Sequence, residues 1–297
     1  MSSGMPGAGV ALLLVLVLLL GGVCAETPPT VRVGSKSFTE SYILGEIAAQ
    51  VMERAGEARV ERRLGLGGTG ITYHAIEHGA IDLYVEYTGT AFTAILKQPP
   101  ISDPDSVYRF VAAEYARRFR LHWTAPLGFN NTFAILVRRA DAERYGLRSI
   151  ADLARVAPRW KAGFGYEFLE RADGFGGLAK VYGLQFSQPP TAMDLGLTYR
   201  ALADGRVDVI AGNSTDGQIA ALDLVALSDD RGYFPPYQAA PVVRAAVLEK
   251  YPAVGAALAE LGGKISDAEM RRLNELADVQ HKDITEIARA WLAERLP

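Results

Sequence analysis

The sequence predicts an α/β protein, and three observations support that fold class. Short apolar strands alternate with amphipathic helices from Val31 onward, the order found in chains that build largely parallel sheets. The 297 residues suffice to bury a sizeable core in one large domain or two small ones. With 49% apolar and 22% charged residues, the composition is that of a globular chain rather than a disordered one.

The first 25 residues form a segment of their own. They contain no charged side chain, and residues 10–20 are an unbroken apolar run. We interpret residues 1–25 as a secretory signal peptide cleaved after Ala25, which predicts a periplasmic or otherwise extracytoplasmic protein. A retained membrane anchor is the alternative, although the run is short for a bilayer span. A lipid on Cys24, the only cysteine, is disfavoured by the bulky Val23 before it, and cleavage would leave a mature chain without disulfides.

The first elements of the mature chain are a strand and a helix. Residues 31–35 are expected to form the strand, and Ser37 and Glu40 are spaced as a capping box at the start of the helix. Apolar residues at helical spacing mark the buried face of that helix. They are Ile43, Ile47 and Val51.

Short apolar runs between turn residues predict the remaining strands. A short helix is expected over residues 71–79, directly before a strand over residues 81–87. The other strands are expected over residues 58–64, 132–139, 161–168 and 207–212. The C-terminal end is expected to be helical, with capping boxes at Ser266/Glu269 and Asp283/Glu286.

One predicted strand ends in polar and aromatic side chains. The stretch DLYVEYTGT, residues 82–90, ends in a tyrosine followed by two threonines around a glycine. Because ligands of parallel α/β sheets lie beyond the carboxyl ends of the strands, Tyr87 and Thr90 are expected at a binding cleft.

A glycine-rich motif suggests a dinucleotide enzyme. Residues 65–70 match G-x-G-x-x-G between a strand and a helix, and Glu86 ends the next strand as a ribose-binding acid would. However, the helix has only about nine residues, which is short for a dinucleotide crossover. A tight glycine turn is the favoured interpretation.

A histidine motif suggests a zinc hydrolase. His74, Glu77 and His78 match the H-x-x-E-H pattern of inverted zinc proteases. A catalytic zinc needs a third protein ligand and an open position, and neither His122 nor His281 is an obvious partner. A solvated helix face is therefore favoured, and a hydrolase is kept as the alternative of another class.

Six segments place polar or aromatic residues where strands should meet a cleft. They are GSKSFTE (34–40), EYTGT (86–90), GFNNTF (128–133), ERADG (170–174), GNSTDG (212–217) and FPPYQAAPVV (234–243). In this order and spacing, the signatures within residues 31–296 resemble the glycine betaine/choline/carnitine-binding proteins of osmoprotectant ABC importers. The resemblance implies a two-lobed type II periplasmic binding fold, each lobe a mostly parallel sheet flanked by helices, with two crossovers. Lobe 1 would comprise residues 31–127 plus 237–297, and lobe 2 residues 128–236.

The same resemblance implies a solute receptor rather than an enzyme. A monomer would bind a small zwitterionic quaternary amine and deliver it to ABC permease and ATPase subunits at the membrane. No catalytic residue, metal or cofactor is expected. A nucleic-acid partner is not expected either, because the net charge is −3 and no Lys/Arg block occurs. A sensory ligand-binding module is a further alternative, and it would need a partner chain for signalling.

The chemistry of a betaine fits the residues that match the family's binding positions. A quaternary ammonium donates no hydrogen bond, so aromatic faces hold it by cation–π attraction. A carboxylate prefers a guanidinium, in bidentate geometry where available, together with hydroxyl donors. By resemblance, the carboxylate clamp comprises Lys36, Thr90 and Arg171, and the cage comprises Tyr87, Phe133 and Tyr237.

Three positions depart from the family pattern and leave the ligand open. Asn213 stands where members with high betaine affinity tend to place a fourth aromatic residue, Phe133 where tyrosine is usual, and Asn131 where some members have an acid. A lost ring contact costs about 1 kcal/mol, roughly tenfold in affinity. Asn213 could instead contact a larger, more polar ligand. Glycine betaine, choline, carnitine, proline betaine and ergothioneine all remain candidates.

Overall fold

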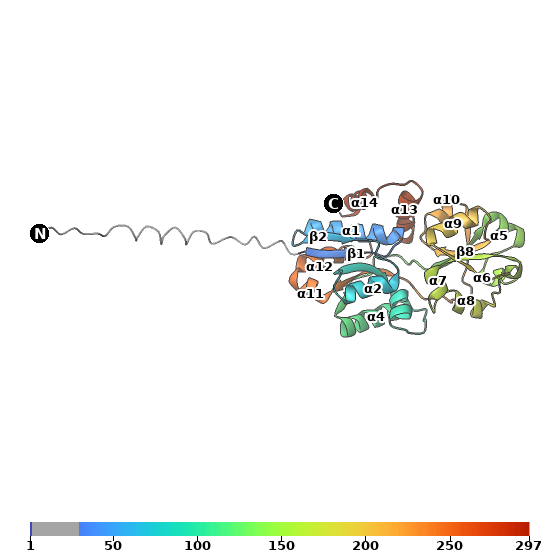
Figure 1. Ribbon diagram of the computed structural model, residues 1–297, viewed down its shortest axis with the longest axis horizontal. Coiled ribbons are helices and arrows are strands. Elements are labelled where there is room, and N and C mark those ends of the chain that lie inside the picture. Colours follow the sequence, from blue (N-terminus) through green and yellow to red (C-terminus); the bar gives the residue numbers. More distant parts are fainter. Residues whose placement is uncertain (2–29, 297) are drawn as a thin grey trace.

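The computed structural model describes Met1 and residues 30–296. The expected signal peptide, apart from Met1, lies outside the described residues. Two bodies, each a sheet covered by helices, lie side by side along the long axis of the molecule (Figure 1). None of the helices in residues 30–296 has the length and apolar character needed to cross a bilayer.

Lobe 1 is built on a five-stranded sheet whose strands come from residues 30–123 and 239–244. Strands β1 and β2 pair in parallel, as do β1 and β3, whereas β10 runs antiparallel to both β3 and β4. In sheet order the strands are β2 (Arg59–Arg63), β1 (Thr30–Gly34), β3 (Leu83–Tyr87), β10 (Ala239–Arg244) and β4 (Leu121–Trp123).

Lobe 2 repeats this arrangement with the middle of the chain. Strand β6 pairs in parallel with β7 and β8, and β5 runs antiparallel to β8 and β9. In sheet order the strands are β7 (Thr191–Met193), β6 (Ala162–Gly165), β8 (Val209–Asn213), β5 (Phe133–Arg138) and β9 (Leu224–Leu227).

The sheets are therefore mixed rather than mostly parallel, and the chain path explains the difference. Two segments cross between the lobes, residues 124–132 and 228–238, and a β-bridge between Asn130 and Gln238 joins them. Each crossing segment enters the next sheet at the strand ends that face the other lobe. Strands β5 and β10, which follow the crossing segments, therefore start beside the other lobe and run antiparallel to β8 and β3, respectively.

Helices cover both faces of the lobe 1 sheet. On one face α1 (Thr39–Ala55) packs against α12 (Pro252–Ala259), α13 (Asp267–Asp278) and α14 (Ile284–Arg295). The expected apolar face of α1 is confirmed, because Ile43, Ile47 and Val51 are buried in that core with Trp291. On the other face α2 (Thr69–Glu77) and α4 (Pro104–Phe119) enclose a second core around Tyr84 and Tyr115.

The remaining short helices connect the strands. In lobe 1 they are α3 (Thr88–Thr90), a π-helix (Ala91–Ile95) and α11 (Ala245–Lys250). In lobe 2 they are α5 (Arg139–Tyr145), α6 (Ile150–Leu153), a 3₁₀ turn (Ala157–Arg159), α7 (Tyr166–Glu170), α8 (Phe175–Tyr182), α9 (Leu195–Ala203) and α10 (Gln218–Ala221).

Two local expectations are wrong and two are confirmed in part. Helix α1 begins at Thr39 without a side-chain cap, so Ser37 and Glu40 form no capping box. Strand β6 ends at Gly165, and residues 166–168 belong to α7, because a short apolar run suits either element. At the C-terminal end, Ser266 and Asp283 cap α13 and α14 by accepting backbone N–H bonds, which is the N-cap half of each expected capping box, while the carboxylate of Glu269 accepts from Arg272 instead.

Candidate functional site

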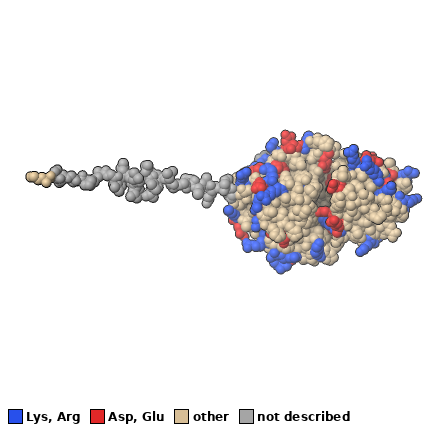
Figure 2. All heavy atoms as spheres, viewed as in Figure 1, with Lys and Arg blue, Asp and Glu red and all other residues tan. Residues whose placement is uncertain are grey.

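A cleft of about 820 Å³ lies between the lobes and receives residues from both. Figure 2 shows the hollow between the two bodies, with acidic side chains at its edge. The eight residues that the sequence analysis assigned to ligand binding all line this cleft. They are Lys36, Tyr87, Thr90, Asn131, Phe133, Arg171, Asn213 and Tyr237.

Arg171 is bound by a buried carboxylate. Its Nε and Nη2 donate to Asp173 at 2.9 and 2.6 Å, and its Nη1 donates to Thr90 Oγ1 at 3.0 Å across the lobes. Asp173 also accepts from the hydroxyls of Thr93 and Tyr237, both at 2.6 Å. Burial alone would lower the pKa of Arg171, but the hydrogen bonds and charge of Asp173 raise it. The bidentate edge that the sequence analysis reserved for a ligand is thus occupied by Asp173, and the Nη1 side remains for other acceptors.

Lys36 is paired in the same way. Its Nζ donates to Glu86 Oε1 at 2.6 Å and to Thr69 Oγ1 at 3.1 Å, and the residues Lys36 and Glu86 are 3% and 0% exposed. The positive charges of Lys36 and Arg171 are therefore balanced within the protein. Such a pair of donors suits a neutral zwitterion better than a free anion, since no net positive charge attracts the latter.

The aromatic side chains lie beside these cations rather than at a separate end of the cleft. The rings of Phe133 and Tyr237 are 5.8 Å apart, and the Cζ of Arg171 is 5.3 and 5.8 Å from their centroids. The Nζ of Lys36 is 5.3 Å from the centroid of Tyr87. A further ring that sequence reasoning missed, Phe168, lines the cleft 4.9 Å from Phe133.

The glycine of the EYTGT signature makes room for one of these rings. A Cβ on Gly89 would meet both the carbonyl oxygen of Pro236 and the ring of Tyr237 at 2.6 Å. Only glycine therefore lets the second crossing segment pack against the end of β3 and bring Tyr237 to the cleft.

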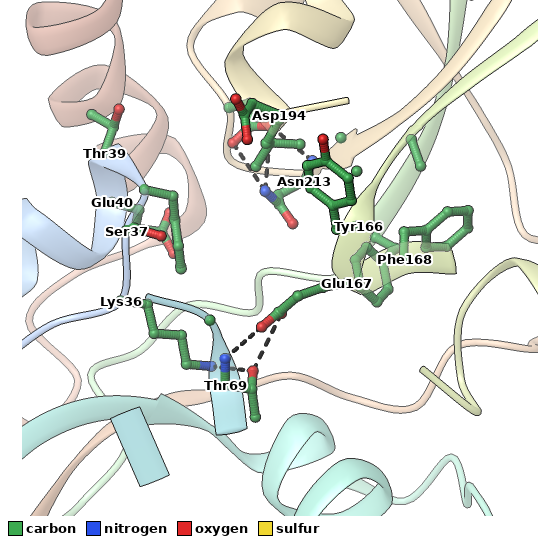
Figure 3. A pocket seen from close by; sticks show the side chains of 18 of the residues that line it. Lys36, Ser37, Thr39, Glu40, Thr69, Tyr166, Glu167, Phe168, Asp194 and Asn213 are labelled. Atoms are coloured by element: carbon green, nitrogen blue, oxygen red, sulfur yellow. Dashed lines mark hydrogen bonds between the residues drawn. The ribbon is translucent and has the colours of Figure 1, made fainter. Parts of the chain in front are cut away.

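Hydrogen-bond acceptors lie beside Phe133 on the lobe 2 side of the cleft, where Asn213 is the cross-strand partner of Phe133. The amide nitrogen of Asn213 lies 3.4 Å from both carboxylate oxygens of Asp216, which also accepts bonds from the Asn213 backbone N–H and the Tyr199 hydroxyl. Burial raises the pKa of Asp216 to about 7. The amide oxygen of Asn213 consequently turns away from Asp216 and toward the cleft, as Figure 3 shows. This oxygen needs an N–H or O–H donor, which a trimethylammonium group cannot supply.

Glu40 joins the lobes at the back of the cleft. Its carboxylate accepts from the Tyr87 hydroxyl at 2.7 Å, the Asn131 amide at 2.8 Å, the Thr215 hydroxyl at 2.5 Å and the Asn274 amide at 2.9 Å. The residue is 2% exposed, and burial raises the pKa of Glu40 against the opposing effect of these donors. The expected ligand residues Tyr87 and Asn131 are thus held in place by a carboxylate that the sequence analysis read as a helix cap.

A second carboxylate, Glu167, bridges the mouth of the cleft. It projects from α7 in lobe 2 and accepts bonds from the backbone N–H and the hydroxyl of Thr69, at the N-terminus of α2 in lobe 1 (Figure 3). Burial would raise the pKa of Glu167, but the charge of Lys36 and the bonds from Thr69 lower it. Nothing in the sequence around GYEF distinguishes Glu167 from an ordinary exposed glutamate.

The two enzyme motifs lie in different places relative to the cleft. His74, Glu77 and His78 are exposed on α2, and none of them lines the cleft. The glycine-rich segment does line it, and Gly65 and Gly67 have φ values of 74° and 142°, as a glycine turn requires.

Comparison with known proteins gives concordant results. Residues 29–294 match the family model described as the substrate binding domain of ABC-type glycine betaine transport system. The chain is 37% identical over 272 residues to the ergothioneine transport permease/ergothioneine binding protein EgtU of Helicobacter pylori, covering 91% of this chain and 48% of that relative. It therefore spans about half the length of that protein. It is 33% identical over 275 residues to the carnitine transport binding protein OpuCC of Listeria monocytogenes, covering 92% and 89% of the two chains.

A solved structure supports the fold. The crystal structure of a glycine betaine/carnitine/choline ABC transporter protein superposes with a TM-score of 0.75 at 33% identity, covering 89% of this chain and 98% of that one.

Proposed function

The chain belongs to the family of substrate-binding domains of ABC-type glycine betaine transport systems, and from this premise we propose that it receives a betaine carrying a hydrogen-bond donor, of the ergothioneine type. The observation that carries the proposal is the amide oxygen of Asn213, which faces the cleft without a protein donor among the described residues. The imidazole-thione ring of ergothioneine offers N–H donors, whereas glycine betaine and proline betaine offer none. Carnitine, with one hydroxyl, is the next candidate, and choline offers the same donor but no carboxylate.

The charges of the cleft support a zwitterion as the ligand class. Lys36 is balanced by Glu86 and Arg171 by Asp173, so the donors that would hold a carboxylate carry no net charge with their partners. The quaternary ammonium would lie against the faces of Tyr87, Phe133 and Tyr237 that Lys36 and Arg171 leave uncovered, because aromatic faces attract a cation that cannot be hydrogen-bonded. The third group of the ligand, its hydrogen-bond donor, would then reach the amide oxygen of Asn213.

The protein performs no chemistry in this proposal. It works outside the cytoplasm as a monomer, after removal of a signal peptide or held by a retained anchor, and hands its ligand to permease and ATPase subunits. Lobe 2 comprises residues 128–236, and rotation about the two crossing segments closes the cleft over the ligand. Closure excludes water, which strengthens each polar contact to the ligand.

Asn213→Tyr should reverse the preference between ligands. The added ring should tighten glycine betaine by roughly tenfold, because a cation–π contact is worth about 1 kcal/mol. It should weaken ergothioneine by about tenfold to a hundredfold, because it fills the space of the third group and removes its acceptor. Isothermal titration of wild type and variant with glycine betaine, carnitine and ergothioneine measures both effects.

Asn213→Leu is the matched control, since leucine keeps the size of asparagine but has neither acceptor nor ring. It should weaken ergothioneine without tightening glycine betaine. If both variants bind every betaine as wild type does, Asn213 does not contact the ligand, and the ergothioneine-type proposal fails while a simpler betaine receptor remains.

A further inference from the structure

A second group of potential ligand atoms lies outside the cleft, on the exposed side of α2. His74, Glu77 and His78 each offer one ligating atom, and these atoms lie within 4.8 Å of one another. Their i, i+3 and i+4 spacing places them on one face of the helix. All three are accessible, because their side chains are 67%, 32% and 74% exposed.

Neighbouring groups orient two of the three side chains. Glu77 Oε1 accepts the Tyr73 hydroxyl at 2.9 Å, and Glu77 Oε2 lies 3.1 Å from His74 Nδ1 and 3.9 Å from His78 Nδ1. His78 Nδ1 lies 2.9 Å from the carbonyl oxygen of His74, which requires a proton on that nitrogen. The Nε2 atom of His78 is then left with the lone pair that a metal ion needs. Ligating histidines are commonly held in this way by a backbone carbonyl.

The position in the helix also favours a cation. His74 lies in the last turn of α2 and His78 is its C-cap residue. The carbonyl groups at a helix C-terminus carry partial negative charge, and this stabilises positive charge placed there.

We propose that His74, Glu77 and His78 form a surface site for a divalent transition-metal ion such as Cu²⁺, Ni²⁺ or Zn²⁺. Two imidazoles and one carboxylate suit these ions, whereas Ca²⁺ and Mg²⁺ prefer all-oxygen ligands. The site has no part in a hydrolase, because Glu77 serves as a ligand and the three residues lie outside the cleft. It is independent of the proposed solute function, and it departs from the sequence-based expectation of no metal.

Metal titration of the purified chain without an affinity tag tests the site. One ion should bind per chain, with Cu²⁺ tighter than Ni²⁺ and Zn²⁺. His78→Ala and His74→Ala should each weaken binding by about tenfold or more, since each removes one of three protein ligands. His122→Ala, at an exposed histidine on β4, is the matched control and should bind as wild type does.

Electron paramagnetic resonance of the Cu²⁺-loaded chain gives an independent readout. Hyperfine coupling should report two imidazole nitrogens in wild type and one in His78→Ala. The proposal is overturned if no saturable binding occurs, or if binding and spectrum survive in the His74→Ala and His78→Ala variants.

Discussion

Arg171→Ala should weaken binding of the preferred betaine by about 2–5 kcal/mol, roughly thirtyfold to several thousandfold in Kd. The reason lies in the contacts of Arg171, whose guanidinium orders Asp173 and Thr90 and lies over the ring of Phe133. Its loss removes the donor proposed for the ligand carboxylate and leaves the Asp173 side chain, 1% exposed, without a cation. Isothermal titration measures the loss.

Two variants separate binding from folding. Arg139→Ala removes an exposed arginine that pairs with Asp223 elsewhere in lobe 2, and it should bind as wild type does. The double variant Arg171→Ala/Asp173→Ala removes the unpaired buried charge, so it should recover part of the stability lost in Arg171→Ala but none of the binding. Wild-type affinity in Arg171→Ala would remove this residue from the site.

Glu40→Ala should lower the free energy of unfolding by about 3 kcal/mol. Four side chains, drawn from both lobes, donate hydrogen bonds to the buried carboxylate of Glu40. A buried donor that loses its acceptor costs about 1–3 kcal/mol. The donors include Tyr87 and Asn131, so ligand affinity should fall with stability. Glu53→Ala, at the exposed end of the same helix, is the control and should change stability by less than about 0.5 kcal/mol. Chemical denaturation checks both values.

The Glu40 effect should also depend on pH. Because the pKa of Glu40 is raised above 4.5, the folded protein binds a proton there at a pH where the unfolded chain does not. The stabilisation that comes from binding this proton is fully present below pH 4.5 and is lost as the pH rises through the folded-state pKa of Glu40. The difference in stability between wild type and Glu40→Ala should therefore widen as the pH is lowered. A difference that is constant or narrows on acidification would contradict the raised pKa.

The α/β class and its main elements could be predicted because local patterns carry them, whereas the two lobes and the site residues were implied by the family resemblance. The apolar spacing of α1 and the short strand runs depend only on neighbours in the sequence, and the polar residues at strand ends lie along the cleft. The mixed sheets were missed because strand direction depends on where a crossing segment enters a sheet. That is a property of the whole chain path, which the pattern within β5 or β10 does not contain.

The partners of the site residues could not be predicted from the sequence. The sequence pattern gave Asp173 no role beyond its place in the ERADG segment, made Glu40 a helix cap and gave Glu167 no role. These three carboxylates hold Arg171, Tyr87 and the N-terminus of α2. Each contact joins segments far apart in the chain, so no spacing rule reports it. The bidentate edge of Arg171 was assigned to the ligand for the same reason.

The measurement that tests the central claim most directly is isothermal titration of the wild-type chain, in the presence of a chelator, with ergothioneine, carnitine, choline and glycine betaine. We predict one ligand per chain, no metal requirement, and tighter binding of ergothioneine than of glycine betaine. Absence of saturable binding for all four, or binding that needs a metal ion, would contradict the account of the cleft as a betaine receptor.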